Sequence, residues 1–263
     1  MEAREQEQSP SSLGLITRSF MSNRPTERKV EIAKLWLRLA RYGSVALCRL
    51  PSRVCAAADR DRIEQLGREM APVVERDPTS AAKYTDYDRW VPFNVVRIGA
   101  LGLHNSKPLR MLDIGCGPGY FLAAALACGH DCYGIDAPET ILSKVEARVY
   151  SEMLSSLGCA NRVSPLLIER FVAMPLPQSD LDLITAYWIC FNRHRQPDEW
   201  GVAEWRFFID DALSHLRSGG MLHLELNENP ERYTLLKWYD QETVDYFRSA
   251  GTVQGGMVRV TKG

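Results

Sequence analysis

Short apolar runs alternate with helical stretches between residues 111 and 226, and this alternation narrows the possible folds more than any other feature. Helix-like periodicity covers Tyr120–Cys128, Glu139–Leu157 and Ala203–Leu216. The runs between them suit strands buried on both faces, and they are Met111–Ile114, Asp131–Ile135, Val163–Ile168, Leu181–Trp188 and Met221–Leu226. Strand, helix and strand at this spacing predict an α/β, doubly wound, mostly parallel sheet.

The C-terminal stretch predicts two further strands. Gln241–Ala250 reads as a helix, and Val253–Val260 reads as a hairpin around Gly255-Gly256. A hairpin that follows a parallel sheet adds antiparallel strands at one edge. The sheet is therefore expected to contain seven strands.

The N-terminal third has a different character. Residues 1–28 are polar and poor in periodicity, which predicts a flexible arm. A helix is expected from Glu31 to Leu50, ended by Pro51, and a second from Ala57 to Glu75. We therefore expect three parts: the arm, a helical cap over residues 29–90, and the α/β domain over residues 91–263.

The charge balance limits the partners. Lys and Arg number 32 and Asp and Glu number 33, a net charge of −1, which argues against a DNA-binding protein. The expected helix is basic and amphipathic, so residues 31–50 suit either packing on the chain's own core or weak contact with a membrane surface. Packing is the more common use of such a stripe. The oligomeric state is left open.

Location and metal content follow from equally simple observations. No apolar run approaches the roughly 20 residues that span a bilayer, and no secretory signal is visible, so we expect a cytoplasmic protein. The seven cysteines form no C-x-x-C pair. Cys128-Gly129-His130-Asp131-Cys132 offers too few ligands for structural zinc, so no metal is expected.

The glycine loop Asp113-Ile114-Gly115-Cys116-Gly117-Pro118-Gly119 lies where a strand gives way to a helix. Glycines there let the backbone approach a ligand at the helix N-terminus. A dinucleotide fingerprint needs a third glycine at position 120 or 122, where Tyr120 and Leu122 stand, which argues against a nicotinamide-dependent oxidoreductase. Asp113 would repel a pyrophosphate and attract a cation.

S-adenosylmethionine fits these charges, because it carries an ammonium and a sulfonium group and no phosphate. A second acid, Asp136, ends the next predicted strand. A carboxylate at that place can accept hydrogen bonds from both hydroxyls of a ribose.

On these residues the sequence resembles the class I, Rossmann-like S-adenosylmethionine-dependent methyltransferases over about residues 107–263. Pro175-Leu176-Pro177, Leu181-Asp182-Leu183-Ile184 and Leu216-Arg217-Ser218-Gly219-Gly220 strengthen the resemblance. It implies cofactor-binding roles for the glycine loop and for residues near it, which are Asp113, Gly115, Cys116, Gly117, Gly119, Asp136, Ala137, Arg170, Phe171, Tyr187 and Tyr84. Arg170 and Phe171 would border the adenine, although the family often has an acid in the place of Arg170. Tyr84, or equally Tyr87, would present an aromatic face to the sulfonium.

The methyl acceptor is expected at the end of the fourth strand, where ligands of open parallel sheets bind. The Asn/Asp-Pro-Pro-aromatic motif of many enzymes that methylate amides and nucleobases is missing there. Candidate substrate contacts are Trp188, Asn192 and Arg193, and His194 is the candidate general base. A solvated role for His194 and the neighbouring arginines is equally open.

These features together predict an S-adenosylmethionine-dependent methyltransferase that acts on a small or lipid-like molecule, with oxygen as the acceptor atom. Two alternatives stay open: a non-catalytic protein of the same fold that binds the cofactor, and an RNA methyltransferase.

Overall fold

The computed structural model describes residues 25–41, 44–177, 179–188, 200–226 and 239–263. In these residues the strands form one seven-stranded sheet in the order β3-β2-β1-β4-β5-β7-β6. The strands from β3 to β5 run parallel, and β7 pairs antiparallel with β5 and β6. Their bounds are β1 Arg110–Ile114, β2 Asp131–Asp136, β3 Val163–Pro165, β4 Leu181–Tyr187, β5 Leu216–Glu225, β6 Thr252–Gln254 and β7 Met257–Thr261. The predicted doubly wound sheet with an antiparallel edge is confirmed.

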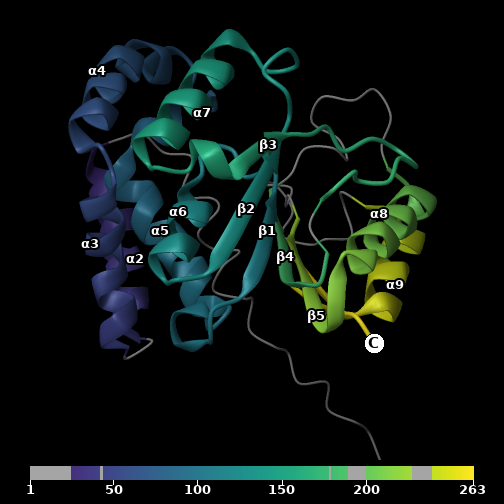
Figure 1. Cartoon of the computed structure of the whole chain (residues 1–263). Helices are drawn as coiled ribbons and strands as arrows, with labels where there is room; N and C mark the ends of the chain where they lie inside the picture. Colours follow the sequence, from purple (N-terminus) through teal and green to yellow (C-terminus); the bar gives the residue numbers. More distant parts are fainter. Residues whose placement is uncertain (1–24, 42–43, 178, 189–199, 227–238) are drawn as a thin grey trace, which may run out of the picture.

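Helices cover both faces of this sheet (Figure 1). One face carries α2 to α7, and the other carries α8 and α9. The helices are α2 Pro25–Arg41, α3 Val45–Ala57, α4 Arg60–Arg76, α5 Tyr87–Ala100, α6 Tyr120–Ala127, α7 Lys144–Ser156, α8 Val202–Ser214 and α9 Gln241–Ala250, with short 3-10 turns η1 Ala81–Thr85, η2 Leu103–Asn105 and η3 Ala160–Arg162. No helix among the described residues is long and apolar enough to cross a membrane.

The strands alternate between two apolar cores. Met111 and Leu183 face the core shared with the N-terminal helices, whereas Leu112 and Ile184 face the core shared with α8 and α9. Both faces are buried, as the apolar runs require. Trp205 is fully buried in the second core, so it serves packing.

The predicted helix from Glu31 to Leu50 is two helices, which corrects the sequence prediction. Helix α2 ends at Arg41, and α3 begins after Ser44, whose hydroxyl accepts a hydrogen bond from the backbone N–H of Leu47 at 3.3 Å. Pro51 lies inside α3 and is buried with its apolar neighbours instead of ending the helix. Tertiary packing therefore outweighs the loss of one backbone hydrogen bond at this proline.

Helix α5 crosses residue 90, where the sequence predicted the cap to end and the α/β domain to begin. Nearly all its side chains are buried, because α5 packs against α2, α3 and α6. One continuous apolar core joins the N-terminal helices to the sheet. Helix α5 thus packs between the N-terminal helices and α6.

Candidate functional site

The glycine loop connects β1 to α6 and is held against the end of β2. The N–H groups of Gly115 and Cys116 donate to the carbonyl oxygen of Ile135 at 2.8 and 3.1 Å. Gly115 and Gly117 have φ angles of 67° and 50°, in the left-handed region that favours glycine. The loop is therefore fixed in a shape that other residues would adopt only with strain.

Gly119 has a packing role at the start of α6. Its φ is 82°, and a Cβ atom added there would lie 2.6 Å from Cδ2 of Leu154 on α7. Gly119 does not line the adjacent cavity. Gly119 therefore supports close packing of α6 on α7, and its cofactor contact stays a prediction.

A cavity of about 370 Å³ opens at the carboxyl ends of β1, β2 and β4. Its volume lies within the usual range for small-molecule sites. The glycine loop lines it, and α5 contributes Trp90, Asn94 and Arg97. The other residues that line it include Asp136, Ala137, Ile141, Leu142, residues 166–168, Tyr84, Tyr187 and Trp188.

Asp136 binds the loop directly. Its carboxylate accepts a short hydrogen bond from the N–H of Gly117 and a second, at 2.7 Å, from the N–H of Ala137. The Gly117 N–H, which a pyrophosphate would need, is thus donated to a carboxylate. Each carboxylate oxygen keeps further acceptor capacity, which suits the hydroxyls of a ribose.

Asp113 is a buried carboxyl at the end of β1, and it also lines the cavity. The Thr185 hydroxyl donates to its Oδ1 at 2.7 Å. Burial raises the pKa of Asp113 to about 7, although the Thr185 hydrogen bond and the positive charge of Arg97 lower it. A bound cation would stabilise the ionised form, so the site is chemically suited to an ammonium group.

Cys116 forms part of the cavity wall without being reactive. The side chain is buried, and burial raises the pKa of its thiol well above the usual value, reinforced by the nearby Asp136 and Asp113 carboxyls. It stays a neutral thiol at physiological pH and packs tightly against β2. A Cβ atom added to Gly134 would lie 2.7 Å from Sγ of Cys116.

A buried ion pair, which sequence reasoning missed, joins Arg97 in the wall of the cavity to Glu225. Nε and Nη2 of Arg97 each donate to a carboxylate oxygen of Glu225 at 3.2 Å, and Nη1 donates to the Asn94 side chain at 3.2 Å. The guanidinium carbon lies 3.9 Å from the ring centroid of Tyr187 and 4.5 Å from that of Trp188. Trp90, Asn94 and Arg97 recur at helical spacing, which was the available sequence signal.

The end of β4 carries two aromatic side chains into this wall. Trp188 has a φ of 53°, which is rare for a large residue, and its N–H donates to the Glu225 carbonyl at 2.8 Å. The Tyr187 hydroxyl is buried and has no hydrogen-bond partner among the described residues. Buried polar atoms without a hydrogen-bond partner are uncommon in folded proteins.

Part of the chain matches a known protein family. Residues 112–224, from β1 to β5, match the sequence profile of a family described as Methyltransferase domain. Residues 112–224 are therefore similar to a methyltransferase domain, in keeping with the family resemblance of the sequence.

Solved structures similar to the chain include several methyltransferases. CalS10, an amino pentose methyltransferase from Micromonospora echinaspora, is 21% identical with a TM-score of 0.38, over 55% of this chain and 53% of CalS10. An O-methyltransferase from Thermotoga maritima is 18% identical with a TM-score of 0.37, over 59% and 49%. A methyltransferase from Aquifex aeolicus is 19% identical with a TM-score of 0.40, over 62% and 88%.

These similarities are weak, and the match spans only about half the length of the first of these relatives. No curated protein sequence matches the chain.

The structure brings most of the predicted cofactor residues of the methyltransferase domain to one cavity. Asp113, Asp136, Ala137, Tyr187 and Tyr84 line it together with the loop residues Gly115, Cys116 and Gly117, and so does the predicted substrate contact Trp188. Tyr84 packs against Trp90, with ring centroids 4.8 Å apart. Its alternative, Tyr87, lines a different cavity. Asn192, Arg193 and His194 lie outside the described residues, so their roles stay predictions.

Arg170 and Phe171, which were predicted to border the adenine, are not among the residues that line the cavity, and their adenine contacts stay predictions. Strand β3 ends at Pro165 and not at Ile168, so residues 166–168 occupy the expected position beside it. Phe171 is 54% exposed and packs edge-on against Phe207 at 5.8 Å. Arg170 lies 3.8 Å from the Glu204 carboxylate on α8.

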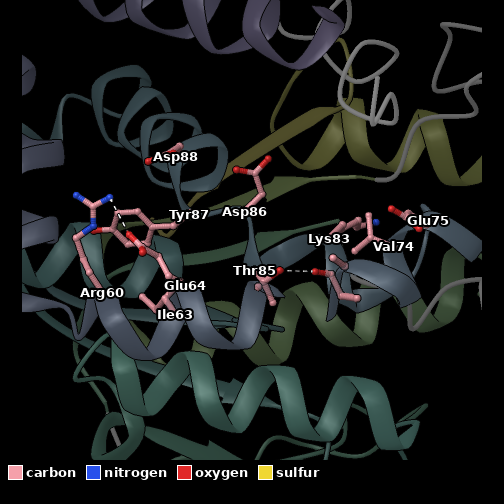
Figure 2. Close-up of a pocket in the computed structure, with 13 residues that line it drawn as sticks. Arg60, Ile63, Glu64, Val74, Glu75, Lys83, Thr85, Asp86, Tyr87 and Asp88 are labelled. Atoms are coloured by element: carbon pink, nitrogen blue, oxygen red, sulfur yellow. Dashed lines mark hydrogen bonds and ion pairs between the residues drawn. The ribbon is translucent and has the colours of Figure 1, made fainter. Parts of the chain in front are cut away.

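A second cavity, of about 480 Å³, lies between α4 and the segment from η1 to the start of α5 (Figure 2). Arg60 and Glu64 pair at 3.6 Å at one end, and Lys83 and Glu75 are at the other. Although it is larger, this cavity is remote from the strand ends and from the glycine loop, so it is not the cofactor site. In the described part of the chain, no group of three His, Cys, Asp or Glu side chains could hold a metal ion.

Proposed function

We propose that this protein is an S-adenosylmethionine-dependent methyltransferase that methylates oxygen on a small or lipid-like acceptor. The pair of acids at adjacent strand ends carries the proposal. Asp113 is buried beside the cavity, and Asp136 receives the Gly117 N–H that a phosphate would otherwise bind. A positively charged cofactor without phosphate suits this pair, and a dinucleotide does not.

The residues at the cofactor end have separable roles in this proposal. Asp113 attracts the ammonium group, and Asp136 orients the ribose through its hydroxyls. Residues 166–168 and Ile141 offer apolar surface to the adenine. The bound cofactor supplies a methyl group already activated on sulfur, so the main work of the protein is to position the acceptor.

The acceptor end suits an uncharged molecule with apolar or aromatic surface. The only cationic side chain among its described lining residues is Arg97, and Glu225 already neutralises it. Trp90, Tyr187 and Trp188 supply aromatic surface. The missing Asn/Asp-Pro-Pro-aromatic motif also favours oxygen over the nitrogen of an amide or nucleobase.

The proposal is tested by transfer of an isotopically labelled methyl group from the cofactor to a panel of acceptors. The panel pairs phenols and hydroxylated lipids with amines of matched shape. We expect label on the hydroxyl compounds, with S-adenosylhomocysteine formed in equal amount. Label on the amines alone would contradict oxygen methylation. Tight cofactor binding without transfer to any acceptor would indicate a non-catalytic binding protein.

A further inference from the structure

The outer face of α2 and α3 exposes large apolar side chains. Val30, Trp36, Leu37 and Val45 are 48%, 43%, 63% and 65% exposed. These are four of the eight large hydrophobic side chains that are exposed in the described chain, so exposed apolar surface is concentrated on one helix pair. Figure 1 shows this pair at the edge of the molecule, outside α5 and α6.

Packing on the protein's own core does not account for these side chains. Leu35 and Leu39 already fill the inward face of α2 and are almost fully buried. Val30 and Leu37 are seven positions apart, so they share one face, and that face is turned about 140–160° from Leu35. On α3, Leu47 is buried while Val45 is exposed. The exposed apolar residues are therefore separate from the buried residues of α2 and α3 that face the core.

Cationic side chains accompany these apolar residues on the same two helices. Residues 29–53 contain six lysines and arginines and one acidic residue, in a chain whose net charge is −1. The exposed cations Lys29, Lys34, Arg41 and Arg49 make no ion pair or side-chain hydrogen bond with any described residue. Their charge is available to a partner, and that partner must be anionic.

We propose that the α2–α3 face docks on an anionic lipid surface. Apolar side chains would enter the headgroup region while the flanking cations bind lipid phosphates, as interfacial amphipathic helices do. Neither helix could cross the bilayer, so the contact is peripheral. A second copy of the chain would oppose like charges across a symmetric interface. Single-stranded RNA favours aromatic platforms, and this face offers aliphatic residues apart from Trp36.

Co-sedimentation of the full chain with vesicles tests the proposal. We expect binding to vesicles of phosphatidylglycerol and phosphatidylcholine in equal parts, weakened by salt, and little binding to phosphatidylcholine alone. Lys34→Gln with Arg41→Gln should weaken binding roughly 25-fold, since each basic residue contributes about fivefold. Leu37→Glu should weaken it by at least about tenfold through lost apolar burial and added negative charge.

Matched variants elsewhere provide the controls. Arg68→Gln with Arg76→Gln removes two exposed cations from α4, and Val172→Glu places a charge at another exposed apolar position. Both should bind vesicles as the parent does, and thermal unfolding should show all variants folded. Equal binding to both lipid mixtures, or equal losses in control and test variants, would overturn the proposal. The proposal would also be overturned if the parent protein does not bind vesicles but binds RNA or self-associates, and the double variant Lys34→Gln with Arg41→Gln abolishes that RNA binding or self-association.

Discussion

Replacing Asp113 by Asn should stabilise the cofactor-free protein and weaken cofactor binding. Asp113 is 2% exposed, and the Thr185 hydroxyl is its one hydrogen-bond donor among the described residues. Burial raises the pKa of this carboxyl from 3.8 to about 7, so keeping it ionised in the folded protein is costly. Asparagine keeps the shape and the Thr185 hydrogen bond and removes the charge.

The expected gain in the free energy of unfolding follows from this change in pKa. A pKa that rises from 3.8 to about 7 on folding corresponds to roughly 4 kcal/mol of lost stability above pH 7. The side-chain N–H groups of the introduced asparagine lack a partner, which costs about 1–3 kcal/mol. The net gain at pH 8 is therefore about 1–3 kcal/mol in the free energy of unfolding, or a rise in Tm of roughly 5 °C.

The pH dependence provides the sharper test. Because the folded-state pKa is raised, the penalty is absent below about pH 4, grows as the pH rises to about 7, and is level above that. Thermal unfolding of Asp113→Asn and of the parent at pH 4, 6 and 8 measures the difference. A variant that is less stable than the parent at pH 8 would refute the account of Asp113 as a buried, poorly compensated carboxylate.

Cofactor binding should respond in the opposite direction. Asp113→Asn loses a charged partner of the ammonium group, so the Kd at pH 8 should rise about 10- to 100-fold. In the parent, the affinity should fall as the pH drops below about 7, because the carboxyl must then lose a proton on binding. An unchanged Kd would show that Asp113 does not contact the cofactor.

Three further predictions concern other parts of the site. Asp136→Ala should weaken cofactor binding by about 1–3 kcal/mol in a calorimetric titration, and equal affinity would mean that Asp136 does not contact the ribose. Arg97→Met should destabilise the fold by about 3–5 kcal/mol in urea unfolding, because it leaves Glu225 buried without its partner. Adding Glu225→Leu should restore part of this stability, and strictly additive effects of the two substitutions would contradict a buried ion pair. Gly119→Ala should lower the free energy of unfolding by about 1–2 kcal/mol, because the φ of 82° is strained for alanine. Most of this loss should remain when the same change is made in a protein that also carries Leu154→Ala. Full recovery in that background would attribute the loss to the Leu154 contact alone.

Sequence patterns predicted the sheet well, because its strands are short apolar runs buried on both faces. They predicted β3 less well: the apolar run continues to Ile168, but pairing with β2 stops at Pro165. Because the predicted strand was three residues longer than β3, the adenine contacts were expected at Arg170 and Phe171. The residue at which strand pairing stops depends on the neighbouring strand, so the sequence of the apolar segment alone does not predict it.

Helix α5 escaped prediction for a related reason. It is buried on nearly all sides, so it lacks an amphipathic period, and Pro92 and Gly99 argue against a helix locally. Only the helical spacing of Trp90, Asn94 and Arg97 indicated the cavity residues that this helix carries. The partner of Arg97 is Glu225, on a strand 128 positions away, and only the fold brings the two together.

The most direct test of the central claim is calorimetric titration of the full chain with S-adenosylmethionine and, in parallel, with NAD⁺. The loop donates its Gly117 N–H to Asp136 and presents two carboxyl groups to the cavity. We expect one-to-one binding of S-adenosylmethionine, weakened in Asp136→Ala, and no heat with NAD⁺. Binding of NAD⁺ with no response to S-adenosylmethionine would contradict the account.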